Sequence, residues 1–150
     1  FHGGAQAYWH EGACYALTPR EVDEIEAATN ELHRLCLEAA AHVIERRRYL
    51  ELAIPPAAVP LIERSWEEEP PSLYGRFDLV HDGRHPPRML EYNADTPTAL
   101  LEAAVVQWYW LQDVAPGRDQ FNSIHERLLA AWTDVAPALL GDRVHFASLD

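Results

Sequence analysis

The chain has 150 residues, of which 48% are hydrophobic and 24% charged, so its length and apolar content predict one folded domain with a buried core and not a disordered segment. Its 24 acidic residues outnumber 12 basic ones, and the net charge of -12 argues against nucleic acid and anionic membrane surfaces as partners. All the basic residues are arginines, which excludes a phosphate-gripping lysine or a lysine base within this chain.

Two cysteines, Cys14 and Cys36, are too few for a disulfide framework, and we expect both to be free thiols in a reducing compartment. The sequence has no apolar run of the ~18 residues that span a bilayer and no secretory leader, so we expect a cytoplasmic protein. Because the chain opens at Phe1 without an initiator methionine and closes at Asp150 just after a strand-like run, we expect both ends to be cut, and a missing leader stays open as the alternative.

The first predicted element is a long helix that begins after Thr18. Thr18 is typical of an N-cap, Pro19 suits the first helical position, and Glu21 completes a capping box. Apolar or small residues then recur in steps of three and four, at Val22, Ile25, Thr29, Leu32, Cys36, Ala39 and Val43. We expect this helix to reach about Tyr49, with the run 46–48 of three arginines in its last turns, where cations complement the helix dipole.

Prolines then interrupt the chain, and a shorter helix is predicted over residues 60–68 with Ile62 and Trp66 on its buried side. The period next changes from 3.6 to 2. Residues 74–80 and 88–93 alternate and flank a loop with Asp82-Gly83, which predicts an antiparallel hairpin. His81 and His85 have metal-ligand spacing, but we expect them to lie in a solvent-exposed turn.

The two faces of this hairpin differ in chemistry. Successive side chains of a strand point to opposite faces, so burying Phe77, Leu79, Leu90 and Tyr92 turns Arg76, Asp78, Glu91 and Asn93 to a common side. In the register that places Asp78 opposite Glu91, Arg76 faces Asn93. Two carboxylates and an amide oxygen suit Mg²⁺ shared with phosphates, and Arg76 offers a donor fork for a carboxylate or phosphoryl oxygen. From the pattern alone, a solvated polar face is the favoured interpretation, and the cation site is the alternative.

After the hairpin, Thr96-Pro97 repeats the cap-then-proline signature and predicts a helix whose apolar side includes Leu100, Ala104 and Leu111. Its start would bind an anion such as a substrate carboxylate, with the hydroxyls of Thr96 and Thr98 as additional donors. From the pattern alone, the favoured interpretation is that Thr96 acts only as an N-cap. Within this helix, residues 108–110 are Trp-Tyr-Trp, and one helical turn places at least one of these rings in the core, so we expect core packing and not stacking on a nucleobase. A last helix is predicted over residues 120–140 and a strand over residues 144–147.

Three runs carry a resemblance to a known family. They are Ser72-Leu-Tyr-Gly-Arg-Phe-Asp78; Leu90-Glu-Tyr-Asn-Ala-Asp-Thr-Pro-Thr98 with Leu100-Leu-Glu-Ala-Ala-Val-Val-Gln107; and Asp119-Gln-Phe-Asn-Ser123 with His125-Glu-Arg127. In content, order and spacing they resemble the glutathionylspermidine synthase family. Tyr8-Trp9-His10-Glu11 and Leu35-Cys36-Leu37-Glu38 extend the similarity to nearly the whole chain.

The resemblance implies an ATP-grasp-like synthetase that activates the glycine carboxylate of glutathione as an acyl phosphate, which a spermidine amine then attacks. By position, it implies that Asp78, Glu91 and Asn93 ligate Mg²⁺, that Arg76 stabilises the transferring phosphoryl group, and that Thr96 and Thr98 contact glutathione. The resemblance implies that these residues are the N-terminal part of the synthetase domain. Most ATP contacts, including the lysines with which the family grips the nucleotide, would lie beyond them, so we expect the 150 residues alone to be inactive. The chain is most similar to stand-alone members without an amidase domain, whose acid and amine need not be glutathione and spermidine.

The expectation is therefore an α+β fold, a partial ATP-grasp-like domain with long helices packed on a mainly antiparallel sheet that contains the 74–80/88–93 hairpin. The function expected of the complete protein is amide-bond formation between a glutathione-like acid and a polyamine-like amine, with ATP and Mg²⁺. Two alternatives stay open at this point, a non-catalytic acidic module that docks a basic partner and a Mg²⁺-dependent phosphohydrolase.

Overall fold

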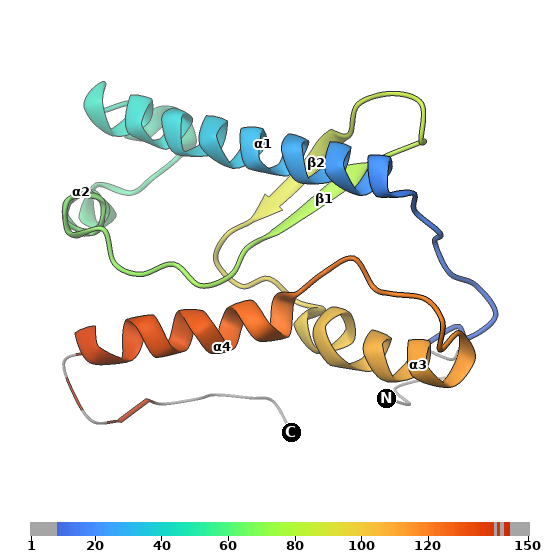
Figure 1. Cartoon of the computed structure of the whole chain (residues 1–150). Coiled ribbons are helices and arrows are strands. Elements are labelled where there is room, and N and C mark those ends of the chain that lie inside the picture. The colour runs from blue at the N-terminus through green and yellow to red at the C-terminus, as the bar shows by residue number, and fades with distance from the viewer. Residues whose placement is uncertain (1–8, 140, 142, 145–150) are drawn as a thin grey trace, which may run out of the picture.

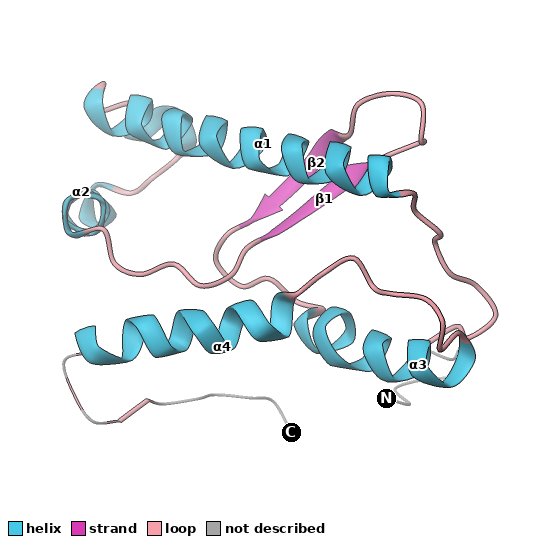
Figure 2. Ribbon diagram, in the orientation of Figure 1, coloured by secondary structure: helices cyan, strands magenta, loops and turns pink. Residues whose placement is uncertain are grey.

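A computed structural model describes residues 9–139, 141, 143 and 144 of the chain. Its elements are helices and one antiparallel hairpin, which agrees with the expected α+β class. The long helix α1 (Pro19–Glu45) runs across the hairpin of β1 (Arg76–Val80) and β2 (Arg88–Asn93), as Figure 1 shows. Helices α3 (Gln107–Val114) and α4 (Ile124–Val135) follow one another on the other side of the hairpin in that view, and α2 (Val59–Glu68) lies near the C-terminal end of α1 (Figure 2).

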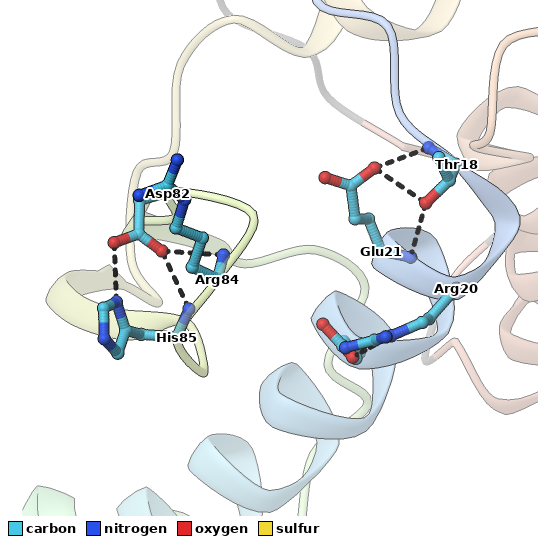
Figure 3. A network of polar contacts seen from close by, with 7 residues as sticks. Thr18, Arg20, Glu21, Asp82, Arg84 and His85 are labelled. Atoms are coloured by element: carbon cyan, nitrogen blue, oxygen red, sulfur yellow. Dashed lines mark hydrogen bonds and ion pairs between the residues drawn. The ribbon is translucent and has the colours of Figure 1, made fainter.

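Helix α1 begins as the sequence predicts. The Glu21 N–H donates to the Thr18 hydroxyl over 3.3 Å, and the Thr18 N–H donates to the Glu21 carboxylate over 2.7 Å, which forms the capping box (Figure 3). Of the predicted apolar stripe, all but Ala39 are half-buried. Hydrogen bonding to the Thr18 N–H and hydroxyl lowers the pKa of Glu21 from its usual 4.5.

The end of α1 differs from the prediction. The helix stops at Glu45, so the three arginines lie beyond it and not in its last turns. Arg47 adopts a left-handed conformation with φ of 51°, and the Arg48 N–H donates to the Val43 carbonyl over 2.9 Å. This is a Schellman ending with arginine at a position that usually holds glycine, and such a local ending overrides the propensity to continue a helix.

Tyr49 joins the end of α1 to α2. Its side chain is buried, and its hydroxyl donates to the Glu63 carboxylate of α2 over 2.9 Å, while the Arg47 guanidinium pairs with the same carboxylate at 2.7 Å. Burial, with the Glu63 contact second, raises the pKa of Tyr49. The prediction that Trp66 faces inward is wrong, since 38% of it is exposed and only Ile62 of the two is half-buried.

The hairpin has the expected register through its first three pairs. Arg76 faces Asn93, Phe77 faces Tyr92 and Asp78 faces Glu91. A bulge then follows Asp78, because Leu79 pairs with Met89 and leaves Leu90 without an opposite residue. Leu90 is 70% exposed, so the prediction that it shares a buried face with Tyr92 is wrong. An extra residue in one strand reverses the alternation beyond it, and the sequence pattern did not reveal that insertion.

The loop between the strands is folded on Asp82. Its carboxylate accepts from the Arg84 and His85 N–H groups over 2.9 and 2.8 Å, and its second oxygen lies 2.8 Å from His85 Nδ1 (Figure 3). These contacts, the His85 ring first, lower the pKa of Asp82. His85 is exposed as expected, but His81 is not, because both its ring nitrogens are shielded from solvent.

The next helical segment begins at Leu100 and not at Thr96, so Thr96 is not its N-cap. Residues Glu102–Val106 form a π-helical turn before α3. In and just after this turn, the Ala103 carbonyl accepts from the Asn122 side-chain amide over 3.3 Å, and the Gln107 side chain donates to Gln120 Oε1 over 3.3 Å. The last predicted helix is shorter than expected: α4 is followed only by a 3₁₀ turn, Ala136–Ala138. The strand predicted over 144–147 falls mostly outside the described residues, and Val144 itself is not in a strand.

The described part of the chain has little core of its own. Among the described residues, only the apolar side chains of Tyr49, Ala104 and Leu111 are buried. Of the Trp-Tyr-Trp run, Trp108 and Tyr109 are exposed, whereas Trp110 is half-buried with its indole nitrogen shielded from solvent. The accessible surface is 12653 Å², whereas a compact monomer of 17.0 kDa exposes roughly 7,700 Å². Few apolar side chains of the described residues are therefore buried against one another, and the expectation of one incomplete domain stays a prediction. Among them, no helix has the length and apolar composition that a bilayer crossing requires.

Candidate functional site

The candidate site is the polar face of the first three hairpin pairs. Arg76 and Asp78 come from β1, and their partners in the register, Asn93 and Glu91, come from β2. Residues directly opposite one another in an antiparallel pair have Cβ atoms about 5 Å apart, so the four side chains share one small patch. Asp78 and Asn93 are half-buried and Glu91 is exposed.

Arg76 organises this patch. Its Nε donates to Asp78 Oδ1 over 2.8 Å and its Nη2 to Oδ2 over 3.3 Å, which is a two-pronged contact between a guanidinium and a carboxylate. Its remaining terminal nitrogen donates to the Thr98 hydroxyl over 2.8 Å and to the Thr98 carbonyl over 3.2 Å. Hydrogen bonding to Asp78, followed by the charges of Asp78 and Glu91, raises the pKa of Arg76 above its ordinary value. The cation is therefore permanent.

The segment after β2 is a turn and not a helix start. The Thr96 N–H donates to Asn93 Oδ1 over 3.0 Å, and the Asn93 amide donates to the Thr96 carbonyl over 3.4 Å. Ala99 has a φ of 66°, and the Ala103 N–H closes the first helical bond onto the Ala99 carbonyl. The expected anion site at a helix start beginning with Thr96 is thus absent from this segment. Thr98, by contrast, is brought to Arg76 through its side chain.

The donor set is chemically suited to Mg²⁺. Asp78 and Glu91 supply carboxylate oxygens and Asn93 an amide oxygen, all hard ligands of the kind that Mg²⁺ prefers. Each Asp78 oxygen accepts one bond from Arg76, which leaves lone pairs on both. No group of three or more His, Cys, Asp and Glu side chains gathers in the described residues, so a metal held here would depend on the Asn93 amide and on substrate oxygens.

A cavity of about 520 Å³ lies elsewhere, between the segment before α1 and the end of α3. Trp9, Leu17, Trp110 and Phe121 contribute to its walls, and none of the six predicted site residues does. Arg118, Asp119 and Gln120 also line this cavity. We place the candidate site on the hairpin because two carboxylates, an amide and a guanidinium face one another there in the observed register.

The contacts on the opposite face of the hairpin were not predicted from the sequence. The rings of Phe77 and Tyr92 stack with centroids 4.0 Å apart, and His33 of α1 lies 3.1 Å from the Tyr92 hydroxyl. Phe77 and Tyr92 were recognised as apolar, but the partner on α1 lies 59 residues away in sequence from Tyr92. No local pattern reports a contact of that span.

The chain is similar in sequence to one protein family and to several proteins of known name. The sequence profile described as glutathionylspermidine synthase preATP-grasp matches residues 1–150. A Haemophilus influenzae protein whose name places it among the acid–amine ligases is 50% identical over 124 residues, covering 81% of this chain and 31% of that protein. The glutathionylspermidine synthase of Crithidia fasciculata is 40% identical over 101 residues, or 64% of this chain and 14% of its own length.

A third relative, the bifunctional glutathionylspermidine synthetase/amidase of Escherichia coli, is 31% identical over 123 residues. That alignment covers 79% of this chain and 20% of the relative. The chain therefore spans less than a third of the length of each of these three relatives.

Proposed function

The chain belongs to the glutathionylspermidine synthase preATP-grasp family, and from this premise we propose that the complete protein is an ATP- and Mg²⁺-dependent carbon–nitrogen ligase. It joins a glutathione-like acid to a polyamine-like amine. The observation that carries the proposal is the common face of Arg76, Asp78, Glu91 and Asn93, with Arg76 linked to Thr98. The names of the relatives, two glutathionylspermidine-forming enzymes and one acid–amine ligase, support the same class.

In the proposed reaction, a carboxylate oxygen of the acid attacks the γ-phosphorus of ATP, ADP leaves, and an acyl phosphate forms. The amine nitrogen then attacks the acyl carbon and phosphate leaves, with loss of a proton from the nitrogen. Bound Mg²⁺ would neutralise phosphate charge during the first transfer. Asp78, Glu91 and Asn93 would hold it, and each supplies an oxygen atom on the same strand pair.

Arg76 has the properties that phosphoryl transfer requires of a charged donor. It is fixed before any substrate arrives, because Asp78 and Thr98 already hold three of its nitrogens. A cation that need not reorganise stabilises developing charge more than one that must be recruited from solvent. Thr96 and Thr98 would contact the acid substrate from the turn that follows β2. Most ATP contacts would come from outside these 150 residues, so the chain alone is expected to turn over negligible ATP.

The test measures amine-dependent ADP release by the complete protein. Asp78→Asn and Glu91→Gln should each lower kcat/KM at least about a hundredfold, because both remove a charged oxygen donor from the phosphoryl-transfer site. Glu67→Gln, an exposed carboxamide substitution in α2, is the matched control and should leave turnover unchanged. Undiminished turnover in both site variants would remove these residues from the mechanism.

The same assay separates the two alternatives. Phosphate release that needs Mg²⁺ but no amine would identify a phosphohydrolase. Absence of any ATP turnover, together with partner capture that is insensitive to Mg²⁺ and ATP, would identify an acidic docking module.

A further inference from the structure

The back of the hairpin is tied to α1 at one point. His33 Nδ1 and the Tyr92 hydroxyl share a hydrogen bond of 3.1 Å, and the two rings meet edge to face, with centroids 6.0 Å apart and planes at 86°. Tyr92 in turn stacks on Phe77 at 4.0 Å and 16°. These contacts form a continuous chain from α1 through β2 to β1.

Both hairpin members of this chain lie between site residues. Phe77 separates Arg76 from Asp78, and Tyr92 separates Glu91 from Asn93. Because neighbouring side chains in a strand point to opposite faces, the two rings are on the reverse side of the four polar groups. Contacts that fix these two rings therefore also restrain the backbone that carries their polar neighbours.

Gly75 shows how closely the Tyr92 ring is held. A Cβ atom at residue 75 would lie 2.8 Å from Tyr92 Cε2 and 3.1 Å from its hydroxyl oxygen. Real Cβ atoms essentially never approach a neighbour as closely as 2.8 Å, so a side chain at residue 75 would displace the Tyr92 ring. Gly75 is thus needed for space, and the tyrosine ring is bounded by Gly75, Phe77 and His33.

The hairpin needs such an anchor at this place. The register slips between Asp78 and Leu79, directly beside the Asp78–Glu91 pair. A slip of one residue would turn Glu91 and Asn93 to the opposite face. The Phe77–Tyr92 pair is the apolar pair on the regular side of the bulge.

We propose that Tyr92, held by His33 and accommodated by Gly75, is a positioning residue that sets the place of Glu91 and Asn93 relative to Arg76 and Asp78. This inference rests on the proposed function. It goes beyond it by assigning control of the metal and phosphate side of the site to a side chain that does not face the substrates, and to a helix outside the hairpin.

The test uses the complete protein and compares the KM for Mg²⁺ with kcat. Tyr92→Phe keeps the stack but removes the hydroxyl, and His33→Leu removes the same hydrogen bond from the other side. Each should raise the KM for Mg²⁺ about threefold, a typical contribution of one exposed hydrogen bond, and leave the KM for the amine unchanged. The double variant should be no worse than either single one, because both lose the same bond.

Two further variants provide the controls. Tyr109→Phe removes a hydroxyl from a 66% exposed tyrosine of α3 and should change nothing. His33→Asn, whose amide can occupy the place of Nδ1, should restore the KM for Mg²⁺ to near the wild-type value. The inference would be overturned if the KM for Mg²⁺ stayed at the wild-type value in Tyr92→Phe and His33→Leu. It would also be overturned if the double variant raised the KM for Mg²⁺ about ninefold, the product of two independent effects.

Hydrogen exchange separates this inference from the function. Absence of amine-dependent ADP release in the wild-type protein would refute the proposed function alone. In that case the amides of residues 91–93 are followed directly, and they should exchange faster in Tyr92→Phe than in Tyr109→Phe. Equal exchange in the two variants would overturn the positioning role.

Discussion

The same two-residue signature, threonine followed by proline, occurs at Thr18-Pro19 and at Thr96-Pro97, with opposite structural results. The first pair begins α1 through a complete capping box. The second begins no helix, because the helical segment starts four residues later, at Leu100. A local signature therefore decides structure only where nothing else competes for the same groups.

The competition at the second pair can be named. The Thr96 N–H is taken by Asn93 Oδ1, and the Thr98 hydroxyl accepts from Arg76. The third residue after Thr18 is Glu21, which completes the box, whereas the third after Thr96 is Ala99. Ala99 also has a left-handed backbone. Departures from local preference concentrate at functional sites, and this segment adjoins the candidate site.

The largest expected effect is on activity and follows from replacing Arg76, which binds the Thr98 hydroxyl. Arg76→Lys retains the charge but loses the planar fork that holds Asp78 and Thr98 together, so kcat/KM for amine-dependent ADP release should fall about a hundredfold or more. Arg20→Lys is the matched control at the first Thr-Pro pair, where the arginine makes only an exposed ion pair with Glu24. Equal activities of the two variants would contradict the role of the fork.

The second effect is on stability. Thr18→Ala should lower the free energy of unfolding by about 1 kcal/mol, because the first turn of α1 loses its cap. Thr96→Ala removes no cap and should lower it by less than about 0.5 kcal/mol. Chemical denaturation of the complete protein measures both. If Thr96→Ala lowered the free energy of unfolding as much as Thr18→Ala does, the conclusion that Thr96 caps no helix would be contradicted.

A smaller effect is expected at Ala99. Ala99→Gly should stabilise the fold by about 0.5 kcal/mol, since relief of the left-handed strain exceeds the added entropy of the unfolded chain. Ala53 has a φ of 54° away from the site, so Ala53→Gly should give a similar gain and serves as the control. The rate of amine-dependent ADP release should change in Ala99→Gly but not in Ala53→Gly, because only the first substitution loosens the turn that carries Thr98. Thermal unfolding and turnover together test this expectation.

The smallest effect is the pH dependence of the first cap. The pKa of Glu21 is lower in the folded protein than its usual 4.5, so its contribution is fully present above that pH and is lost as the pH falls through the folded value. The difference in Tm between wild type and Thr18→Ala should therefore narrow between pH 7 and pH 3. A difference that widens on acidification would show that Glu21 does not contribute through its charged form.

Within the hairpin too, the sequence predicted some features of the candidate site and not others. Alternation alone identified the polar set Arg76, Asp78, Glu91 and Asn93, and the observed register matches the one expected. The bulge at Leu90 was not predictable, because one inserted residue leaves the composition of the strand unchanged. The roles of the four residues in metal binding and phosphoryl transfer stay predictions.

Packing was the least predictable property. The stripe of α1 and the apolar residues of the later helices were identified, yet few of these side chains are buried in the described part of the chain. Periodicity states which face of a helix is apolar, but it does not state what covers that face.

The sequence by itself determined the features that depend on neighbours within a few residues: the capping box of α1, the two strands, and the grouping of acids, amide and arginine on one face. Tertiary structure alone decided the link from Arg76 to Thr98 and the contact of His33 with Tyr92. The physical reason is that a hydrogen-bonding group serves the partner that best satisfies it. When that partner comes from a distant part of the chain, only the folded arrangement brings it within reach.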